Sequence, residues 1–203
     1  MTTPVNLTGV PETMLMTLHN RANEARRPDT YLHDRDCVRI YDAIDFDYAR
    51  TFGKPIDAHP MRSKIFDTAV KPWMKAHPGG TVVELASGLE TGFQRCDDGR
   101  VNWVCVDLPE AIAVRERFLP PTERCRYIAR SALDVTWMDE VDAARGLFVT
   151  AQGLLMYFPE DEVKRLLRAI MERFPGVEIM FDIVPSWFAR RISKQGGLGK
   201  STP

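Results

Sequence analysis

The chain has 203 residues and a formal net charge of −1, with 44% apolar and 27% charged residues. This composition is ordinary for a soluble globular protein, and the length suits one α/β domain with a full core. Nucleic-acid-binding proteins normally carry a basic excess, so the charge argues against nucleic acid as a partner. No apolar run approaches the roughly 20 residues that cross a bilayer, and the N-terminus lacks the basic start and apolar core of a signal peptide. We therefore expect a cytoplasmic protein with no membrane partner.

The four cysteines show neither a Cys-x-x-Cys spacing nor a pairing with histidine. A structural disulfide or a metal site is therefore not expected. Cys105 falls inside a predicted strand, where its expected role is that of a small apolar core residue.

The first 76 residues are predicted to be largely helical. Apolar residues recur at helical spacing over 11–27, 34–45 and about 60–75. Pro11 suits the first turn of the first of these helices. The stretch 53–59 between the second and third helices is polar and irregular.

The rest of the chain alternates between apolar runs and helical patterns. Strands are predicted at 81–85, 101–106, 125–129, 146–151 and 177–183. Helices are predicted from about 90, over 109–118, near 137–141 and over 160–174. This alternation predicts an α/β fold, a mostly parallel sheet with helices on both faces.

The first strand ends in a turn of small residues, Ala86, Ser87 and Gly88. Small residues there let a nucleotide approach the backbone closely. The spacing differs from the G-x-G-x-x-G of dinucleotide sites, since the first glycine is Ala86 and the third is displaced to Gly92. This weakens an NAD site and favours S-adenosyl-L-methionine (SAM), which has no pyrophosphate. An ordinary strand–helix turn is the alternative interpretation.

Polar side chains follow the next three strands, at the sheet edge where ligands of open α/β sheets bind. Asp107 ends the second strand, about 20 residues after the turn, as expected for a carboxylate that binds ribose hydroxyls. Asp134 follows the third strand and could accept from an adenine amino group, and Gln152 follows the fourth. Alternatively, Asp107 and Asp134 each act as the N-cap of the helix that follows.

The motifs together resemble those of the leucine carboxyl methyltransferase superfamily. The residues that carry the likeness are Val-Val-Glu-Leu-Ala-Ser-Gly-Leu-Glu-Thr-Gly-Phe-Gln-Arg at 82–95, Val-Asp-Leu-Pro at 106–109 and Ala-Gln-Gly-Leu-Leu-Met-Tyr-Phe at 151–158. The N-terminal block over 7–34 is similar to the tetracenomycin-type polyketide branch. The resemblance covers nearly all of 7–188.

The resemblance implies a SAM-dependent O-methyltransferase that acts on the carboxylate of a small, polyketide-like acid, with S-adenosylhomocysteine as product. By motif position, Gly88 would lie under the methionine part of SAM, Asp107 would hold the ribose, and Arg62 would bind the SAM carboxylate. The full set of implied cofactor-binding residues is Arg62, Ala86, Ser87, Gly88, Asp107, Leu108, Leu133, Asp134 and Gln152. The implied substrate candidates are Arg21 and Tyr157.

Three residues depart from the family pattern, in which Ala86 is usually glycine, Glu90 aspartate and Gln152 glutamate. Ala86 suits the turn only if its φ is negative. Gln152 keeps an acceptor oxygen but removes a negative charge from beside the SAM amino group. These departures support a second hypothesis, a non-catalytic SAM-fold binding or scaffold protein.

The resemblance also predicts the domain organisation. Residues 1–76 would form a helical lid, 77–193 the Rossmann-like SAM-binding core, and 194–203 a flexible tail. Met14, Met16 and Phe46 are candidates to line the crevice under the lid. Only five strands are predicted, so the final two of the usual seven are missing from the pattern. Three explanations remain open: the sequence is a fragment, the final hairpin is absent, or a partner supplies it.

The chemistry requires no strong base, because a carboxylate acceptor is already ionised at neutral pH. Alignment of the reacting atoms and exclusion of water would provide the catalysis. No catalytic acid or base is therefore assigned.

Overall fold

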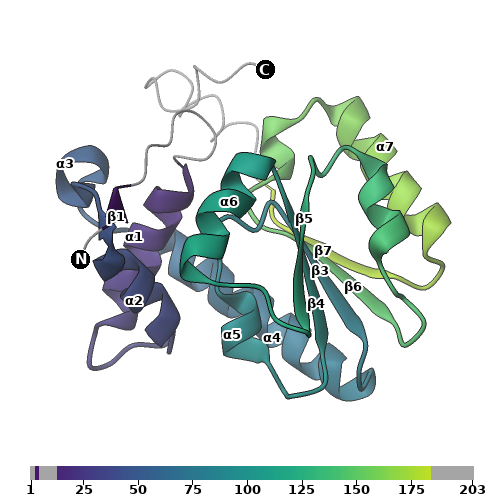
Figure 1. Ribbon diagram of the computed structural model, residues 1–203, viewed down its shortest axis with the longest axis horizontal. Helices are drawn as coiled ribbons and strands as arrows, with labels where there is room; N and C mark the ends of the chain where they lie inside the picture. The colour runs from purple at the N-terminus through teal and green to yellow at the C-terminus, as the bar shows by residue number, and fades with distance from the viewer. Residues whose placement is uncertain (1–2, 5–12, 184–203) are drawn as a thin grey trace.

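The apolar runs in the second half of the chain form one five-stranded sheet in the computed structural model, which describes residues 3–4 and 13–183 (Figure 1). The strand order is β5-β4-β3-β6-β7, and every neighbouring pair is parallel. The strands are β3 (Thr81–Leu85), β4 (Asn102–Asp107), β5 (Cys125–Ala129), β6 (Leu147–Ala151) and β7 (Glu178–Phe181).

The register brings the carboxyl ends of the central strands to one level. Leu85 at the end of β3 pairs with Val106 of β4 on one side and with Ala151 of β6 on the other. The residues that follow these three strands therefore meet at the same edge of the sheet.

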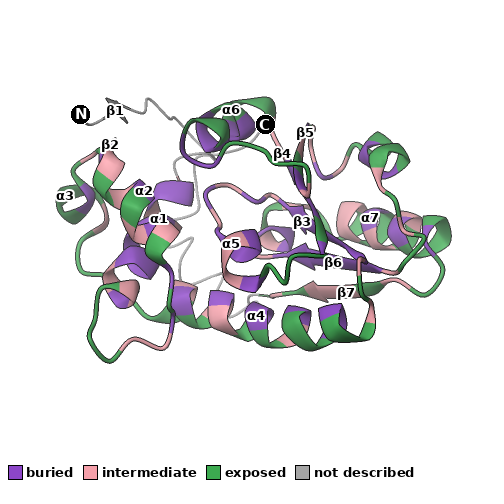
Figure 2. Cartoon of the chain, turned by 60° about the horizontal axis from the view of Figure 1, so that its bottom comes forward, coloured by how far each residue is buried: buried purple, intermediate pink, exposed green. Residues whose placement is uncertain are grey.

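Helices cover both faces of the sheet (Figure 1). On one face, α4 (Ala58–Ala76) and α5 (Gly92–Cys96) pack against alternate residues such as Val82, Trp103 and Phe148. On the opposite face, α7 (Glu160–Arg173) and the 3₁₀ turn η2 (Val135–Glu140) pack against the intervening residues, such as Val83 and Val149. The central strands β3 and β6 are buried along their whole length, whereas β7 is partly exposed (Figure 2).

The N-terminal helices form a second group beside the sheet. They are α1 (Thr13–Ala25), α2 (Arg35–Ala43) and the short α3 (Tyr48–Phe52), with a two-residue pair of strands, β1 (Thr3–Pro4) and β2 (Ile44–Asp45). Their apolar residues, among them Leu15, Leu18 and Ile40, form one cluster with Val114 and Phe118 of α6 (Pro109–Phe118).

The predicted α/β class, the mostly parallel sheet and the helices on both faces are confirmed. The short elements α3, β2 and η3 (Leu155–Tyr157) were not expected from the sequence. The predicted lid included 58–76, yet α4 packs on the sheet through Val70, Trp73 and Met74 and forms a layer of the α/β unit. The tail predicted at 194–203 lies outside the described residues.

All four cysteines are free and buried, and Cys105 occupies the core position expected for it. Among the described residues, no helix combines the length and the apolarity that a membrane crossing requires.

Candidate functional site

A cavity lies at the carboxyl ends of β3, β4 and β6, with α1 and the start of α4 on its other side. Its volume is about 160 Å³, less than the roughly 300–1,000 Å³ of most small-molecule pockets. The cavity is lined by most of the residues predicted from the sequence: Arg62, Ala86, Ser87, Gly88, Asp107, Leu108, Gln152 and Tyr157. Met14 and Met16 also line it, whereas Phe46 packs among the aromatic rings of Tyr48 and Phe52.

The turn after β3 has a left-handed backbone at two positions. The φ of Ala86 is 53° and that of Gly88 is 45°. The condition under which Ala86 would suit the turn, a negative φ, is therefore not met. The Ala86 N–H donates to the Val106 carbonyl at 2.7 Å and the Gly88 N–H to Asp107 Oδ2 at 2.7 Å. These two bonds to β4 and its end hold the turn in a conformation that an L-residue adopts at a cost.

Asp107 lies at the end of β4 and accepts a hydrogen bond at each carboxylate oxygen. Oδ2 accepts from the Gly88 N–H, and Oδ1 accepts from its neighbour Leu108 at 2.7 Å. Burial raises the pKa of Asp107 above its ordinary value, while the two backbone donors act in the opposite direction. Leu108, and not Asp107, is the N-cap of α6. A carboxylate oxygen has two lone pairs, so each can still accept from a hydroxyl.

Three buried polar atoms of cavity-lining residues have no hydrogen-bond partner among the described residues. They are the donor Nε of Arg62, the acceptor Oε1 of Gln152 and the hydroxyl Oγ of Ser87. Buried polar groups are normally paired, so each of these atoms calls for a ligand or solvent partner. The Arg62 donor is complementary to a carboxylate and the Gln152 acceptor to an ammonium group, whereas the Ser87 hydroxyl can donate or accept.

Arg62 is held at the cavity by an ion pair with Asp182, which follows β7. Its Nη1 lies 3.1 Å from Asp182 Oδ2, and the Gly153 N–H donates to the other oxygen of Asp182 at 2.5 Å. A Cβ at position 153 would lie 2.5 Å from Arg62 Nη1, so only glycine allows this close approach. The pair joins α4, the end of β6 and the residues after β7 around one side of the cavity.

Three predicted site residues lie outside this cavity. Leu133 packs against the core cluster under α7, and Asp134 is exposed and caps η2 by accepting from the Thr136 N–H at 3.1 Å. Neither lines the cavity, so their contact with adenine stays a prediction. The third is Arg21.

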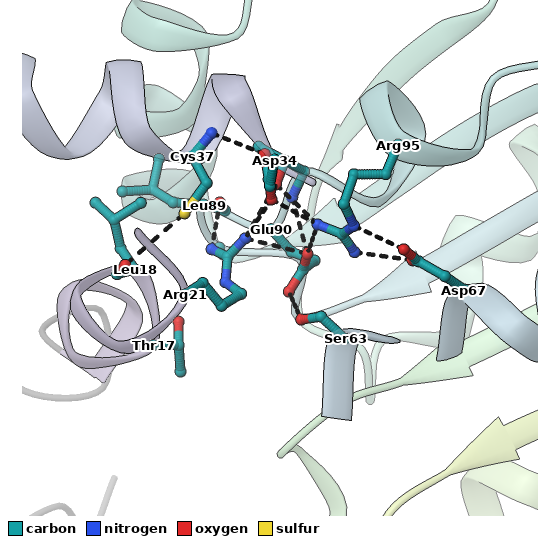
Figure 3. A network of polar contacts seen from close by, with 12 residues as sticks. Thr17, Leu18, Arg21, Asp34, Cys37, Ser63, Asp67, Leu89, Glu90 and Arg95 are labelled. Carbon is teal, nitrogen blue, oxygen red and sulfur yellow. Dashed lines mark hydrogen bonds and ion pairs between the residues drawn. The ribbon is translucent and has the colours of Figure 1, made fainter. Parts of the chain in front are cut away.

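Arg21 is fully buried in a network of charges behind the turn, which Figure 3 shows. Its Nη1 lies 3.1 Å from Glu90 Oε1 and its Nη2 donates to the Leu89 carbonyl at 2.8 Å. Because its guanidinium is engaged inside the protein, this placement argues against the substrate role predicted for Arg21.

The same network contains a second arginine, Arg95 of α5. It forms a two-bond pair with Asp67, at 2.8 and 2.9 Å, and its Nη1 lies 2.9 Å from Asp34 and 2.6 Å from Glu90. Although burial raises the pKa of Glu90, Arg21 and Arg95 together hold it well below its usual range. Glu90 therefore stays ionised. It joins α1, α4 and α5 through Arg21, Ser63 and Arg95, and it also lines the cavity.

Among the cavity-lining residues that the sequence did not point to, two carry ionisable side chains, Glu84 and His59. Glu84 is buried within β3, where its Oε2 accepts from the Trp103 indole N–H at 3.2 Å. Burial raises the pKa of Glu84 to about 8. A carboxyl group inside the otherwise apolar run Val-Val-Glu-Leu was a usable signal. His59, in the first turn of α4, carried none.

The cavity thus offers the carboxylates of Asp107 and Glu90, a free donor, a free acceptor and a free hydroxyl, and no group in it is placed as a strong base. This donor set suits an amino-acid-bearing nucleoside. It can bind and orient such a ligand without proton transfer.

Comparisons with known proteins bear on the family of this chain. The family model described as leucine carboxyl methyltransferase matches residues 14–171. The tetracenomycin polyketide synthesis O-methyltransferase TcmP of Streptomyces glaucescens is 33% identical over 189 residues, which cover 92% of this chain and 70% of that protein. The S-adenosyl-L-methionine-dependent methyltransferase dpfgK of Gibberella zeae is 30% identical over 201 residues, covering 88% of this chain and 67% of that protein.

Among solved structures, the N-methyltransferase NodS of Bradyrhizobium japonicum WM9 is similar with a TM-score of 0.49 and 11% identity, over 72% of this chain and 79% of that one.

Proposed function

Because the chain belongs to the leucine carboxyl methyltransferase family, with SAM as its cofactor, we propose that it methylates the carboxylate of a small, polyketide-like acid. The observation that carries the proposal is the cavity at the carboxyl edge of the sheet, where an unpaired donor and an unpaired acceptor meet a carboxylate. The tetracenomycin enzyme among its relatives supports a polyketide acceptor.

The residues of the cavity fit the polar groups of SAM. Arg62 Nε would donate to the carboxylate of its methionine part and Gln152 Oε1 would accept from its ammonium group. Asp107 would accept from the ribose hydroxyls with the lone pairs that its backbone donors leave free. Ala86, Ser87 and Gly88 would lie under the ligand, where bulky side chains are absent.

When bound, SAM supplies an electrophilic methyl group on a sulfonium. The protein's own contribution is to hold an ionised acceptor oxygen in line with that methyl group and to keep water out. Tyr157 lines the cavity, and burial raises the pKa of its hydroxyl above the usual value, so it remains a hydrogen-bond donor at neutral pH. It would orient the acceptor, and α1 would close over it through Met14 and Met16.

The first test is the substitution Asp107→Ala. Loss of hydrogen bonds to a charged acceptor, worth about 1.5–3 kcal/mol, should weaken cofactor binding roughly 10- to 100-fold. Isothermal titration calorimetry with S-adenosylhomocysteine measures the change. The matched control is Asp139→Ala, because Asp139 is exposed and does not line the cavity. Unchanged affinity in a folded Asp107→Ala variant would show that the ribose is bound elsewhere.

The second test concerns the acceptor. Mass spectrometry of reactions with SAM should detect methyl esters of small aromatic acids and no methylation of the matching phenols or amines. Methylation confined to phenols would refute the carboxylate assignment and leave the family's cofactor chemistry intact.

A further inference from the structure

His59 reaches the cavity from the first turn of α4 and is tied to α1 by one side chain. Nδ2 of Asn20 lies 2.6 Å from Nδ1 of His59. Asn20 is itself buried, and its Oδ1 accepts from the Ile56 N–H at 2.9 Å. A backbone amide, an asparagine and a histidine therefore form one chain of hydrogen bonds.

This chain fixes which nitrogen of His59 carries the proton. The Ile56 N–H can only donate, so the atom of Asn20 that faces it must be the oxygen, and the amide nitrogen must face His59. An amide NH₂ can only donate, so His59 Nδ1 must be the unprotonated acceptor. In a neutral imidazole the other nitrogen, Nε2, then carries the hydrogen.

The surroundings keep the ring neutral. Burial lowers the pKa of His59 to about 4, and the charges of Arg62 and Arg21 act in the same direction, against weaker opposition from Asp182 and Glu90. At neutral pH the ring is a donor at Nε2 and has no free lone pair there. It can bind an acceptor oxygen, and it cannot serve as a base through that atom.

Nε2 has no hydrogen-bond partner among the described residues, although His59 lines the cavity together with Arg62 and Tyr157. We propose that the Nε2–H of His59 donates to a carboxylate oxygen of the methyl acceptor, which makes His59 a substrate-binding residue that selects acids. This inference rests on the proposed function. The Asn20–Ile56 pair is the positioning element that presents this donor.

The assignment is consistent with the electron balance of methyl transfer. One acceptor oxygen gives an electron pair to the new C–O bond, and the pair of the broken C–S bond stays on sulfur. No proton leaves the acceptor, so a fixed donor suffices. A donor on the second oxygen holds the carboxylate in orientation without competing for the reacting lone pair.

The test compares two probes, 1-hydroxy-2-naphthoate and 1-naphthol, which differ by the carboxylate. Calorimetry in the presence of S-adenosylhomocysteine gives their affinities. In His59→Leu we expect the naphthoate to bind about 10- to 100-fold more weakly and the naphthol to bind as in the wild type. His59→Gln, which keeps a side-chain NH donor, should recover part of the loss. The matched control is His33→Leu, because His33 is exposed and outside the cavity.

The outcomes separate this inference from the proposed function. If the wild type binds the naphthoate and His59→Leu binds it equally well, the role of His59 alone is overturned. A wild type that binds neither probe while it binds S-adenosylhomocysteine overturns the proposed acid substrate and this inference with it. Unchanged affinity of His59→Leu for S-adenosylhomocysteine shows that the variant is folded.

A second measurement does not depend on any substrate. Nitrogen-15 NMR of histidine-labelled protein reports the tautomer of each ring. We expect His59 to show a protonated Nε2 and an unprotonated Nδ1 at neutral pH. A protonated Nδ1 would overturn the hydrogen-bond chain through Asn20.

Discussion

At the scale of single residues, Ala86 carries the local strain of the site. Its φ of 53° is the one positive value at a non-glycine position among the described residues. A left-handed conformation costs an L-residue about 1–2 kcal/mol. The two backbone bonds from Ala86 and Gly88 toward β4 show what holds the turn against this cost.

Replacement of Ala86 by glycine should therefore stabilise the protein. We expect Ala86→Gly to raise the free energy of unfolding by about 0.5–1 kcal/mol, since the relief of strain exceeds the extra entropy of glycine in the unfolded chain. Urea denaturation measures the change. Ala113→Gly is the matched control, because Ala113 is exposed in the middle of α6, where the same substitution should destabilise by about 1 kcal/mol. A loss of stability in both variants would contradict the strain argument.

The residues of the site differ in how far sequence could predict them. Asp107 was predictable because the end of an apolar strand places it at the ligand-binding edge. The φ of Ala86 was not, since it depends on the partner carbonyl of Val106 in another strand. His59 was missed because its role depends on Asn20, which lies 39 positions away in the sequence.

At the scale of elements, the buried charge network connects α1 with α4 and α5, whose apolar residues belong to a different core cluster from those of α1. Arg21 comes from α1, Asp67 from α4 and Arg95 from α5, and all of them meet around Glu90 (Figure 3). Removing one partner from a buried ion pair usually costs 3–5 kcal/mol, because the remaining charge is left uncompensated. The network thus fixes where α1 lies relative to the turn after β3.

Loss of Arg21 should loosen that connection. We expect Arg21→Met to lower the free energy of unfolding by about 3–5 kcal/mol and to speed amide hydrogen exchange most in α1. The matched control is Arg27→Met just beyond α1, which should have a much smaller effect, because the Arg27 side chain is exposed and water screens its pairs with Asp29 and Glu24. Equal effects of the two substitutions would mean that the network adds no more than a surface pair does.

Elements with a strong local signal were predicted well. The strand Thr81–Leu85 and the helix Pro109–Phe118 have the predicted bounds, because an apolar run and a proline at the first helical turn define them locally. The five-residue α3 lacks such a signal and is held by contacts of Tyr48 and Phe52 with the ring of His19. The packing of α4 on the sheet could not be predicted, since the apolar stripe of a helix does not reveal which surface it covers.

At the scale of the whole molecule, two buried groups give stability an opposite dependence on pH. The raised pKa of Glu84, about 8, means that the folded state holds a proton that the unfolded chain releases above about 4.5. The contribution of Glu84 to the free energy of unfolding is therefore complete at low pH and is lost as pH rises toward 8. His59, with a pKa lowered to about 4, contributes stability that is present above about 6.5 and is lost as pH falls toward 4.

The substitution Glu84→Gln should remove the first of these dependences. It keeps the size of the side chain and is uncharged at every pH. The wild type should lose up to about 1.4 kcal/mol per pH unit from this group between about 4.5 and 8, and the variant should not. Urea denaturation at pH 5 and at pH 8 gives the comparison. If the difference between the two proteins is the same at both values, Glu84 is ionised throughout and its raised pKa is refuted.

Asp182 pairs with Nη1 of the Arg62 guanidinium and leaves Nε of that group without a partner. A ligand carboxylate that binds at Nε therefore shares one guanidinium with Asp182, which in turn accepts from the Gly153 N–H. The affinity for such a ligand depends on how strongly Asp182 holds Arg62, and by linkage the bound ligand changes the strength of that ion pair by the same factor. The residues after β7 are thereby coupled to the cavity through a single arginine.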